Sequence, residues 1–269
     1  MTGGSPPADH AVPAKADRIV RAMRMTVLGG CGAWPAAGQA CSGYLVEHDG
    51  FRLLIDPGYA TVPRLLVDWS AGDVDAVLVS HGHPDHCADL NPLLRARALG
   101  ETGAPVLAVY ALPGALGPVL ALDTGRMLRS MYQLCEFTAG DQLTIGPFEV
   151  TTRLLPHFVP NAGMRLQAGK AVLTYTGDAG PSPHLAELAD GADLLLAEAT
   201  RIDGLTADEA PYLSDARQAG SNAHRAAVER LVLTHLWPGT DPELARQAAA
   251  RDFTGPIDVA TAGLRLDLG

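Results

Sequence analysis

Apolar residues along the chain fall into short runs, separated by turn-forming residues and by segments with helical spacing. Short apolar runs of this kind indicate strands, and apolar residues that recur every three to four positions indicate helices. The predicted strand regions are 25–29, 42–58 (a hairpin turning at Asp49-Gly50), 73–80, 104–111, 141–156, 162–178, 193–200, 230–235 and 256–263. The predicted helical regions are 59–70, 87–100, a loop and helix region at 113–132, 182–191, a helix from about Asp215, and 241–253.

Strands and helices alternate without a long linker or a repeat of fixed period, which predicts an α/β (α+β) chain. One domain that holds two sheets with helices outside is the simplest arrangement. The first residues are rich in Pro, Ala and Gly and contain no apolar signal-peptide region. We therefore expect a disordered extension at 1–24 and a folded domain at 25–269.

Composition narrows the possible functions. Hydrophobic residues make up 47% and charged residues 19% of the 269 positions, and the formal net charge is −10. This charge disfavours a broad electrostatic grip on nucleic acid, which needs Lys and Arg against the phosphates. No stretch approaches the roughly 20 apolar residues that span a bilayer. We therefore expect that the protein binds no membrane. The four cysteines form no CxxC pair or disulfide framework, which predicts a cytoplasmic protein.

Three of the nine histidines lie in "HGHPDH", directly after the apolar strand region at 73–80. His81 and His83 are two positions apart, so in extended backbone their side chains point the same way. Asp85 and His86 follow Pro84, where the chain turns toward a helix, and project in another direction. The two pairs could therefore serve two separate metal ions.

Three further candidates end apolar strand regions: His157, Asp178 and His235. A single histidine at a strand end is more often a hydrogen-bonded structural residue than a ligand. Seven ligand-type residues at strand ends reverse that preference, and imidazole with carboxylate suits zinc, and also manganese or iron. We interpret the seven residues as metal ligands.

The motifs "HGHPDH", "PHF", "TGD" and "LTH", in this order, resemble those of the metallo-β-lactamase superfamily. The resemblance runs from about Met25 to the C-terminus, and it implies an αββα sandwich of two mixed β-sheets flanked by helices, with two divalent metal ions between the sheet edges. It implies the following ligands: His81, His83 and His157 for the first metal, Asp85, His86 and His235 for the second, and Asp178 for both. Asp56, in "LLIDPG", matches an aspartate that orients a ligand histidine from behind. Without the resemblance, Asp56 could equally be a turn residue.

Two metal ions that share a water lower its pKa and neutralise charge on the attacked group, which predicts hydrolysis of an ester-like bond. The second half of the chain resembles the branch that contains tRNA 3′-processing endonucleases and bacterial zinc phosphodiesterases acting on cyclic nucleotides. In that branch Glu198, in "AEAT", matches a glutamate beside the metals that could orient a proton shuttle. A turn-facing carboxylate is the alternative for Glu198.

Two departures from this branch bear on the substrate. Tyr212 stands where relatives carry a histidine that protonates the leaving oxygen, and a phenol is a poorer proton shuttle at neutral pH. Only 21 positions separate His157 from Asp178, which leaves no room for the arm that grips tRNA in the tRNA-processing relatives. A small-molecule substrate is therefore favoured over a nucleic-acid polymer.

The sequence thus predicts a dinuclear metal-dependent hydrolase, most simply a phosphodiesterase of small nucleotides that include cyclic ones. We place Asp85, Asp178, Glu198 and Tyr212 in its catalytic machinery. A lactone or thioester hydrolase with the same site is the alternative, because a tyrosine near the metals can steady an acyl oxyanion. A non-catalytic metal-binding protein is a second alternative. Relatives are often dimers, so the resemblance leaves a homodimer open.

Overall fold

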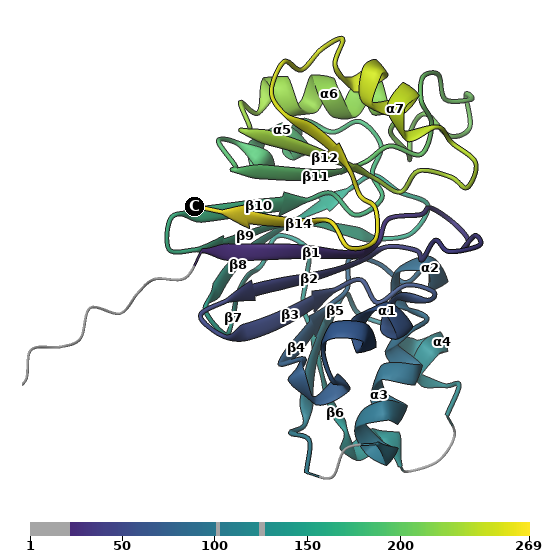
Figure 1. Ribbon diagram of the computed structural model, residues 1–269, viewed down its shortest axis with the longest axis vertical. Helices are drawn as coiled ribbons and strands as arrows, with labels where there is room; N and C mark the ends of the chain where they lie inside the picture. Colours follow the sequence, from purple (N-terminus) through teal and green to yellow (C-terminus); the bar gives the residue numbers. More distant parts are fainter. Residues whose placement is uncertain (1–21, 101–102, 124–126) are drawn as a thin grey trace, which may run out of the picture.

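Two seven-stranded mixed sheets form the centre of the computed structural model, which describes residues 22–100, 103–123 and 127–269 (Figure 1). The first sheet has the order β14-β1-β2-β3-β4-β5-β6. Its strands are β1 (Met23–Gly29), β2 (Gly43–His48), β3 (Phe51–Ile55), β4 (Ala76–Leu78), β5 (Leu107–Ala111), β6 (Tyr132–Glu136) and β14 (Arg265–Leu268). Strands β14 to β3 pair antiparallel, and β3 to β6 pair parallel.

The second sheet repeats this design, with the order β13-β12-β11-β10-β9-β8-β7. Its strands are β7 (Gln142–Ile145), β8 (Phe148–Leu155), β9 (Asn161–Ala168), β10 (Ala171–Tyr175), β11 (Leu194–Glu198), β12 (Arg230–Thr234) and β13 (Ile257–Val259). Strands β7 to β10 pair antiparallel, and β10 to β13 pair parallel. The αββα sandwich of two mixed sheets is therefore confirmed.

Alternate residues of the strands face different cores, as the two-residue repeat of a strand requires. In β3, Leu53 and Ile55 point into the core between the sheets, whereas Leu54 packs in a second core under helices. In β11, Leu196 faces the shared core and Leu195 packs in a third core on the outer face of the second sheet. Both faces of each sheet are thus covered, which explains why the central strands read as continuous apolar runs.

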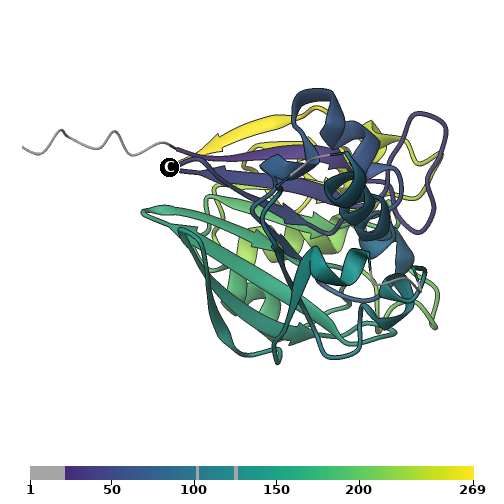
Figure 2. The ribbon, with the colours of Figure 1, turned by 90° about the horizontal axis from the view of Figure 1, so that it is seen from below.

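The helices lie outside the paired sheets: Figure 1 shows the helices of the second half above the sheets and those of the first half below, and in Figure 2, seen from below, the helices of the first half are nearest to the viewer. The helices that follow strands of the first sheet are α1 (Thr61–Asp68), α2 (Pro84–Cys87), α3 (Leu90–Leu99) and α4 (Gly117–Leu120), with short 3-10 turns η1 (Ala71–Asp73) and η2 (Leu128–Ser130). Those of the second half are α5 (Pro183–Ala189), α6 (Ala216–Arg225) and α7 (Pro242–Ala249). In the part of the chain that the structure describes, no helix is long and apolar enough to cross a membrane.

The predicted elements are found, with two differences: two additional edge strands and an earlier start of the first strand. The structure adds the strands β6 and β14, both at sheet edges and both carrying polar residues, so their sequences lack the apolar run that marks a central strand. The predicted hairpin turns at Asp49-Gly50 with positive φ at both residues, which is the geometry that Asp-Gly favours. Strand β1 begins at Met23, two residues before the expected start of the domain, and residues 1–21 of the expected extension lie outside the described residues.

Candidate metal centre

The seven sequence-predicted ligands all follow the carboxyl ends of strands, and they come from both sheets. His81 and His83 follow β4, and Asp85 and His86 lie in the one-turn helix α2. The ligands of the second sheet follow β8, β10 and β12: His157, Asp178 and His235. The structure brings these residues together in two groups that share one carboxylate, the same division that the sequence predicts. The groups are His81, His83, His157 and Asp178, and Asp85, His86, Asp178 and His235.

The ligand atoms of the first group are spaced as a tetrahedral site requires. His83 Nδ1 lies 3.1 Å from both His81 Nε2 and His157 Nε2. Asp178 Oδ2 lies 3.8 Å from the same two Nε2 atoms. Metal–nitrogen bonds of about 2.0–2.1 Å in tetrahedral geometry put neighbouring ligand atoms about 3.3 Å apart. A divalent ion therefore fits between these four atoms.

The second group has the same spacing. His235 Nε2 lies 3.2 Å from Asp85 Oδ2 and 3.1 Å from Asp178 Oδ2. His86 Nε2 lies 3.5 Å from Asp85 Oδ2 and 3.2 Å from Asp178 Oδ1. His86 Nε2 and Asp178 Oδ1 are buried, and their contact lacks hydrogen-bond geometry, so neither atom has a hydrogen-bond partner among the described residues. Buried polar atoms without partners are costly, and a cation at this position would satisfy both.

The charges in the centre oppose the effect of burial on its acids and bases. Burial alone would lower the pKa of His86, but the carboxylates of Asp178 and Asp85 raise it well above its ordinary value. Burial would raise the pKa of Asp178, but His235 and His86 together hold it below its ordinary value. Protonation of His86 thus compensates the carboxylates of the second group, whereas burial lowers the pKa of all three histidines of the first group.

Asp56 is fully buried and is linked by hydrogen bonds to one histidine of each group. It accepts hydrogen bonds from Ser80 N (2.7 Å), Ser80 Oγ (2.6 Å), His86 Nδ1 (2.8 Å) and the Tyr175 hydroxyl (2.8 Å). Since Ser80 Oγ also lies 3.0 Å from His81 Nδ1, Asp56 directs one histidine of each group so that its Nε2 faces the centre. Ser80 and Tyr175 were not singled out from the sequence. Only the place of Ser80 directly before "HGH" could have pointed to it.

Glu198 lies at the end of β11 and reaches His235 through Thr200. The Thr200 hydroxyl is 2.6 Å from Glu198 Oε1 and 3.0 Å from His235 Nδ1, and Ala179 N donates to Glu198 Oε2. Burial, with the nearby charge of Asp178, raises the pKa of Glu198 to about 8. Glu198 therefore lies outside the two groups and positions their members indirectly. It holds His235 through Thr200, and it holds the chain next to Asp178 through the backbone of Ala179. Thr200 was not singled out from the sequence.

Tyr212 lies at the rim of the centre. Its backbone oxygen accepts the Nδ1–H of His157 at 3.0 Å, which turns Nε2 of that ring toward the first group. Its side chain is 39% exposed, and its ring lies 4.8 Å from the ring of Phe158. The hydroxyl makes no hydrogen bond within the described residues.

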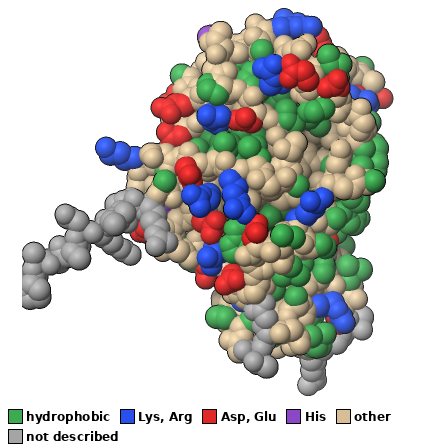
Figure 3. All heavy atoms as spheres, viewed as in Figure 1, with side chains coloured by type: hydrophobic (Ala, Val, Ile, Leu, Met, Phe, Trp, Pro, Cys, Tyr) green, Lys and Arg blue, Asp and Glu red, His purple; other side chains and the backbone are tan. Residues whose placement is uncertain are grey.

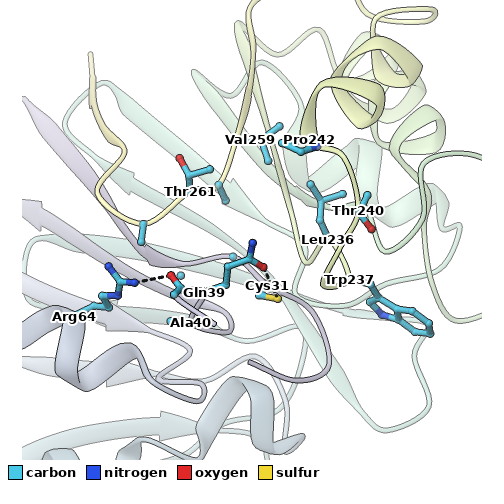
Figure 4. Close-up of a pocket in the computed structure, with 15 residues that line it drawn as sticks. Cys31, Gln39, Ala40, Arg64, Leu236, Trp237, Thr240, Pro242, Val259 and Thr261 are labelled. Atoms are coloured by element: carbon cyan, nitrogen blue, oxygen red, sulfur yellow. Dashed lines mark hydrogen bonds between the residues drawn. The ribbon is translucent and has the colours of Figure 1, made fainter. Parts of the chain in front are cut away.

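The glycine-rich loop after β1 contacts the second group through its backbone. Ala33 N donates to Asp85 Oδ2 at 2.9 Å and lies 3.4 Å from His235 Nε2. A Cβ on Gly32 would meet the backbone oxygen of His235 at 2.4 Å, so only glycine allows this approach. A cavity of about 310 Å³ next to this loop is lined by Cys31, Arg64 and Trp237 among others, but by none of the seven ligands (Figure 4).

Comparison with known proteins agrees with the geometry. A family model described as a beta-lactamase superfamily domain matches residues 51–236. The chain belongs to the beta-lactamase superfamily. The resemblance drawn from the "HGHPDH" series is thereby confirmed, and with the ligand cluster it makes the chain a metal-binding hydrolase of this superfamily.

Relatives within the beta-lactamase superfamily span nearly the whole chain. Probable metallo-hydrolase YhfI from Bacillus subtilis is 30% identical over 244 residues, which are 90% of this chain and 98% of that protein. The crystal structure of YhfI matches with a TM-score of 0.84 and covers 92% of this chain and 99% of its own. Ribonuclease Z from Methanopyrus kandleri is 32% identical over 280 residues, which are 91% of this chain and 97% of that protein. The structure of Zn²⁺-bound PqqB from Methylobacterium extorquens, 19% identical with a TM-score of 0.70 over 91% of this chain and all of its own, shares the fold.

Proposed function

We propose that the protein is a dinuclear metal-dependent phosphodiesterase that hydrolyses small nucleotide phosphodiesters, cyclic nucleotides among them. One observation carries the proposal: Asp178 is shared by two adjacent ligand groups of matching spacing. Two adjacent cations are suited to in-line displacement at phosphorus, because both the attacking and the leaving oxygen need charge compensation. The name of the relative ribonuclease Z supports the same bond type.

The proposed cofactors are two zinc ions, with manganese or iron as alternatives. Five imidazoles and two carboxylates form a ligand set that suits zinc. Bound there, two divalent ions supply a water of lowered pKa and compensate the negative charge of the phosphate.

The side chains of the centre then have distinct tasks. Asp85 and Asp178 both face His235 Nε2, and their carboxylates would orient the attacking water, whose pKa two bound cations would lower. Asp56 and Glu198 keep the histidines oriented through Nδ1 contacts. Tyr212 holds His157 through its carbonyl, and its exposed phenol at the rim is the group available to donate a proton to the leaving oxygen.

Two features support a small substrate over a nucleic-acid polymer. The chain between His157 and Asp178 is filled by the antiparallel pair β9 and β10, with no inserted arm. On the face that Figure 3 shows, basic and acidic side chains lie intermixed and form no broad basic surface. A polymer needs such a surface to compensate several phosphates at once.

A lactone or thioester hydrolase is the second candidate, and Tyr212 favours it. A phenol 39% exposed beside the first ligand group could donate a hydrogen bond to an acyl oxyanion. The same position serves the leaving oxygen of a phosphodiester less well than an imidazole would.

Hydrolysis assays on zinc- and manganese-loaded protein separate the two candidates. The substrates are 2′,3′- and 3′,5′-cyclic nucleotides and bis(p-nitrophenyl) phosphate, assayed beside a lactone and thioester panel, with His83→Ala as the control. We expect phosphodiester turnover that His83→Ala abolishes. Turnover of acyl substrates alone would overturn the phosphodiesterase proposal in favour of the second candidate.

A further inference from the structure

An apolar hollow of about 390 Å³ adjoins the first ligand group. Residues 154–160, which lead from β8 to β9, form most of its wall, and Ser182 and His184 complete it. His157 belongs to this wall, so whatever fills the hollow lies directly beside a candidate metal ligand. A volume of this size falls in the range of small-molecule subsites.

An exposed aromatic ring dominates the hollow. Phe158 is 55% exposed although it follows a ligand whose own side chain is nearly fully buried. Its ring centroid lies 5.3 Å from the ring of His157 and 4.8 Å from that of Tyr212. Two partly exposed aromatic rings, those of Phe158 and Tyr212, therefore lie at the rim. Exposed aromatic rings that adjoin a polar centre commonly mark a binding surface, and bases stack on such rings.

Polar groups at the edge of the hollow can contact the edge of a base. The Ser182 hydroxyl accepts the backbone N–H of His184 at 3.2 Å, and among the described residues it donates to none. The exposed imidazole of His184 pairs with Glu187 at 3.1 Å. An aliphatic acyl chain could neither stack on the ring nor hydrogen-bond to these polar groups. The combination therefore favours a base over an acyl chain.

We propose that this hollow, with Phe158 as its platform, binds the base of the nucleotide substrate. The inference rests on the proposed function and adds the residue that selects the substrate. Recognition of the base places the attached phosphate beside His157, where the first ligand group lies. Phe158 is therefore a specificity-determining residue, and its removal should affect substrate binding much more than the chemical step.

Steady-state kinetics of metal-loaded protein test the proposal with two substrates, adenosine 3′,5′-cyclic monophosphate and the base-free ribose cyclic phosphate. Phe158→Leu keeps apolar bulk but removes the ring. We expect it to raise KM for the base-bearing substrate by about 5- to 150-fold, the range that base–aromatic stacking supplies, and to change kcat less than twofold. KM for the base-free substrate should stay unchanged. An equal effect on both substrates, or on neither, would overturn the proposal.

Trp34→Leu is the matched control. Trp34 is also an exposed aromatic residue (47%), but it lies beside Trp237 on the side of the second group. The variant should keep the preference for the base-bearing substrate. Loss of that preference in Trp34→Leu rather than in Phe158→Leu would place the base on the other side and overturn the proposal.

A binding measurement separates this inference from the proposed function. By calorimetry, adenosine 5′-monophosphate should bind the metal-loaded protein more tightly than ribose 5-phosphate, and Phe158→Leu should remove the difference. If the protein hydrolyses no phosphodiester but shows this base-dependent binding, the proposed function fails and the base subsite stands. If it hydrolyses both cyclic substrates equally well and binds both monophosphates equally, the subsite fails and the function stands.

Discussion

At the scale of single residues, orientation of the ligands depends on buried side chains that touch no substrate. Asp56 accepts from Ser80, His86 and Tyr175 and thereby fixes which nitrogen of two histidines faces the centre. Metal-ligating histidines generally depend on such partners, whose loss weakens metal binding. Asp56 therefore affects both ligand groups at once.

Asp56→Asn should lower metal affinity by about 10- to 100-fold, because the amide cannot accept all of these donors. Competition with a chromophoric chelator measures the affinity. Asp267→Asn, which removes an exposed carboxylate paired with Arg24, is the control and should bind metal normally. Equal affinity in both variants would show that Asp56 is only a turn residue.

Protons compete with cations for the ligand nitrogens, which makes metal binding depend on pH. The pKa of His86 is raised above 6.5 in the folded metal-free protein. A raised pKa stabilises the folded state fully below the unfolded value, and this contribution is lost as pH rises through the folded pKa. The free energy of unfolding of chelated protein should therefore decrease as pH rises above 6.5. The apparent metal affinity should increase over the same range, because fewer protons compete with the cations.

Urea unfolding of the chelated protein and calorimetric metal titrations in buffers of different ionisation enthalpy check both effects. His86→Ala removes the contribution of His86, and the pH dependence that remains above 6.5 belongs to Glu198 and His235, whose pKa values are also raised. Metal binding without proton release at neutral pH would contradict this description of the centre.

At the scale of elements, strand ends and short loops bring the ligands together. The β1–β2 loop reaches Asp85 and His235 because Gly32 carries no side chain there. Sequence spacing alone does not predict this approach, because it cannot show what a loop packs against.

Gly32→Ala should shift the loop or His235 and lower the free energy of unfolding by about 1–3 kcal/mol. It should also weaken metal binding in the second group, measured as a loss of affinity in one of the two steps of a metal titration. Gly117→Ala is the control, because a Cβ there would meet nothing within 4 Å. A Gly32→Ala protein with unchanged stability and two unchanged binding steps would contradict the close approach.

Several elements, and the seven residues that the structure brings together in the two candidate groups, could be picked out from the sequence because their signals are local. The central strands read as apolar runs and end in imidazole or carboxylate residues, as at His157 and His235. The strands β6 and β14 gave no such signal, because edge strands expose alternate polar residues. Tyr175 was missed for a different reason: its hydroxyl reaches Asp56 from the other sheet, which only the tertiary structure shows.

At the scale of the whole molecule, the candidate centre joins the two sheets. Four of its ligands follow β4 of the first sheet, and three follow strands of the second. Ions bound here would therefore stabilise the packing of the two halves, because they bind only the folded arrangement.

Metal-loaded protein should unfold with a free energy about 2.7 kcal/mol higher than chelated protein for each site when free metal is 100 times its dissociation constant. Thermal or urea unfolding with and without chelator measures this difference. In Asp178→Ala the difference should largely disappear, since both groups lose a ligand. A chelator-independent stability of the wild-type protein would show that the centre does not join the halves.

We propose that two ions held by the groups that share Asp178 enable hydrolysis of a phosphodiester. The most direct test is to titrate metal-free protein with zinc and measure turnover of adenosine 3′,5′-cyclic monophosphate and bis(p-nitrophenyl) phosphate at each step. We predict that turnover rises to a plateau at two equivalents of zinc per chain and is absent in His83→Ala. A plateau at one equivalent, or two bound ions without turnover of either phosphodiester, would contradict the account.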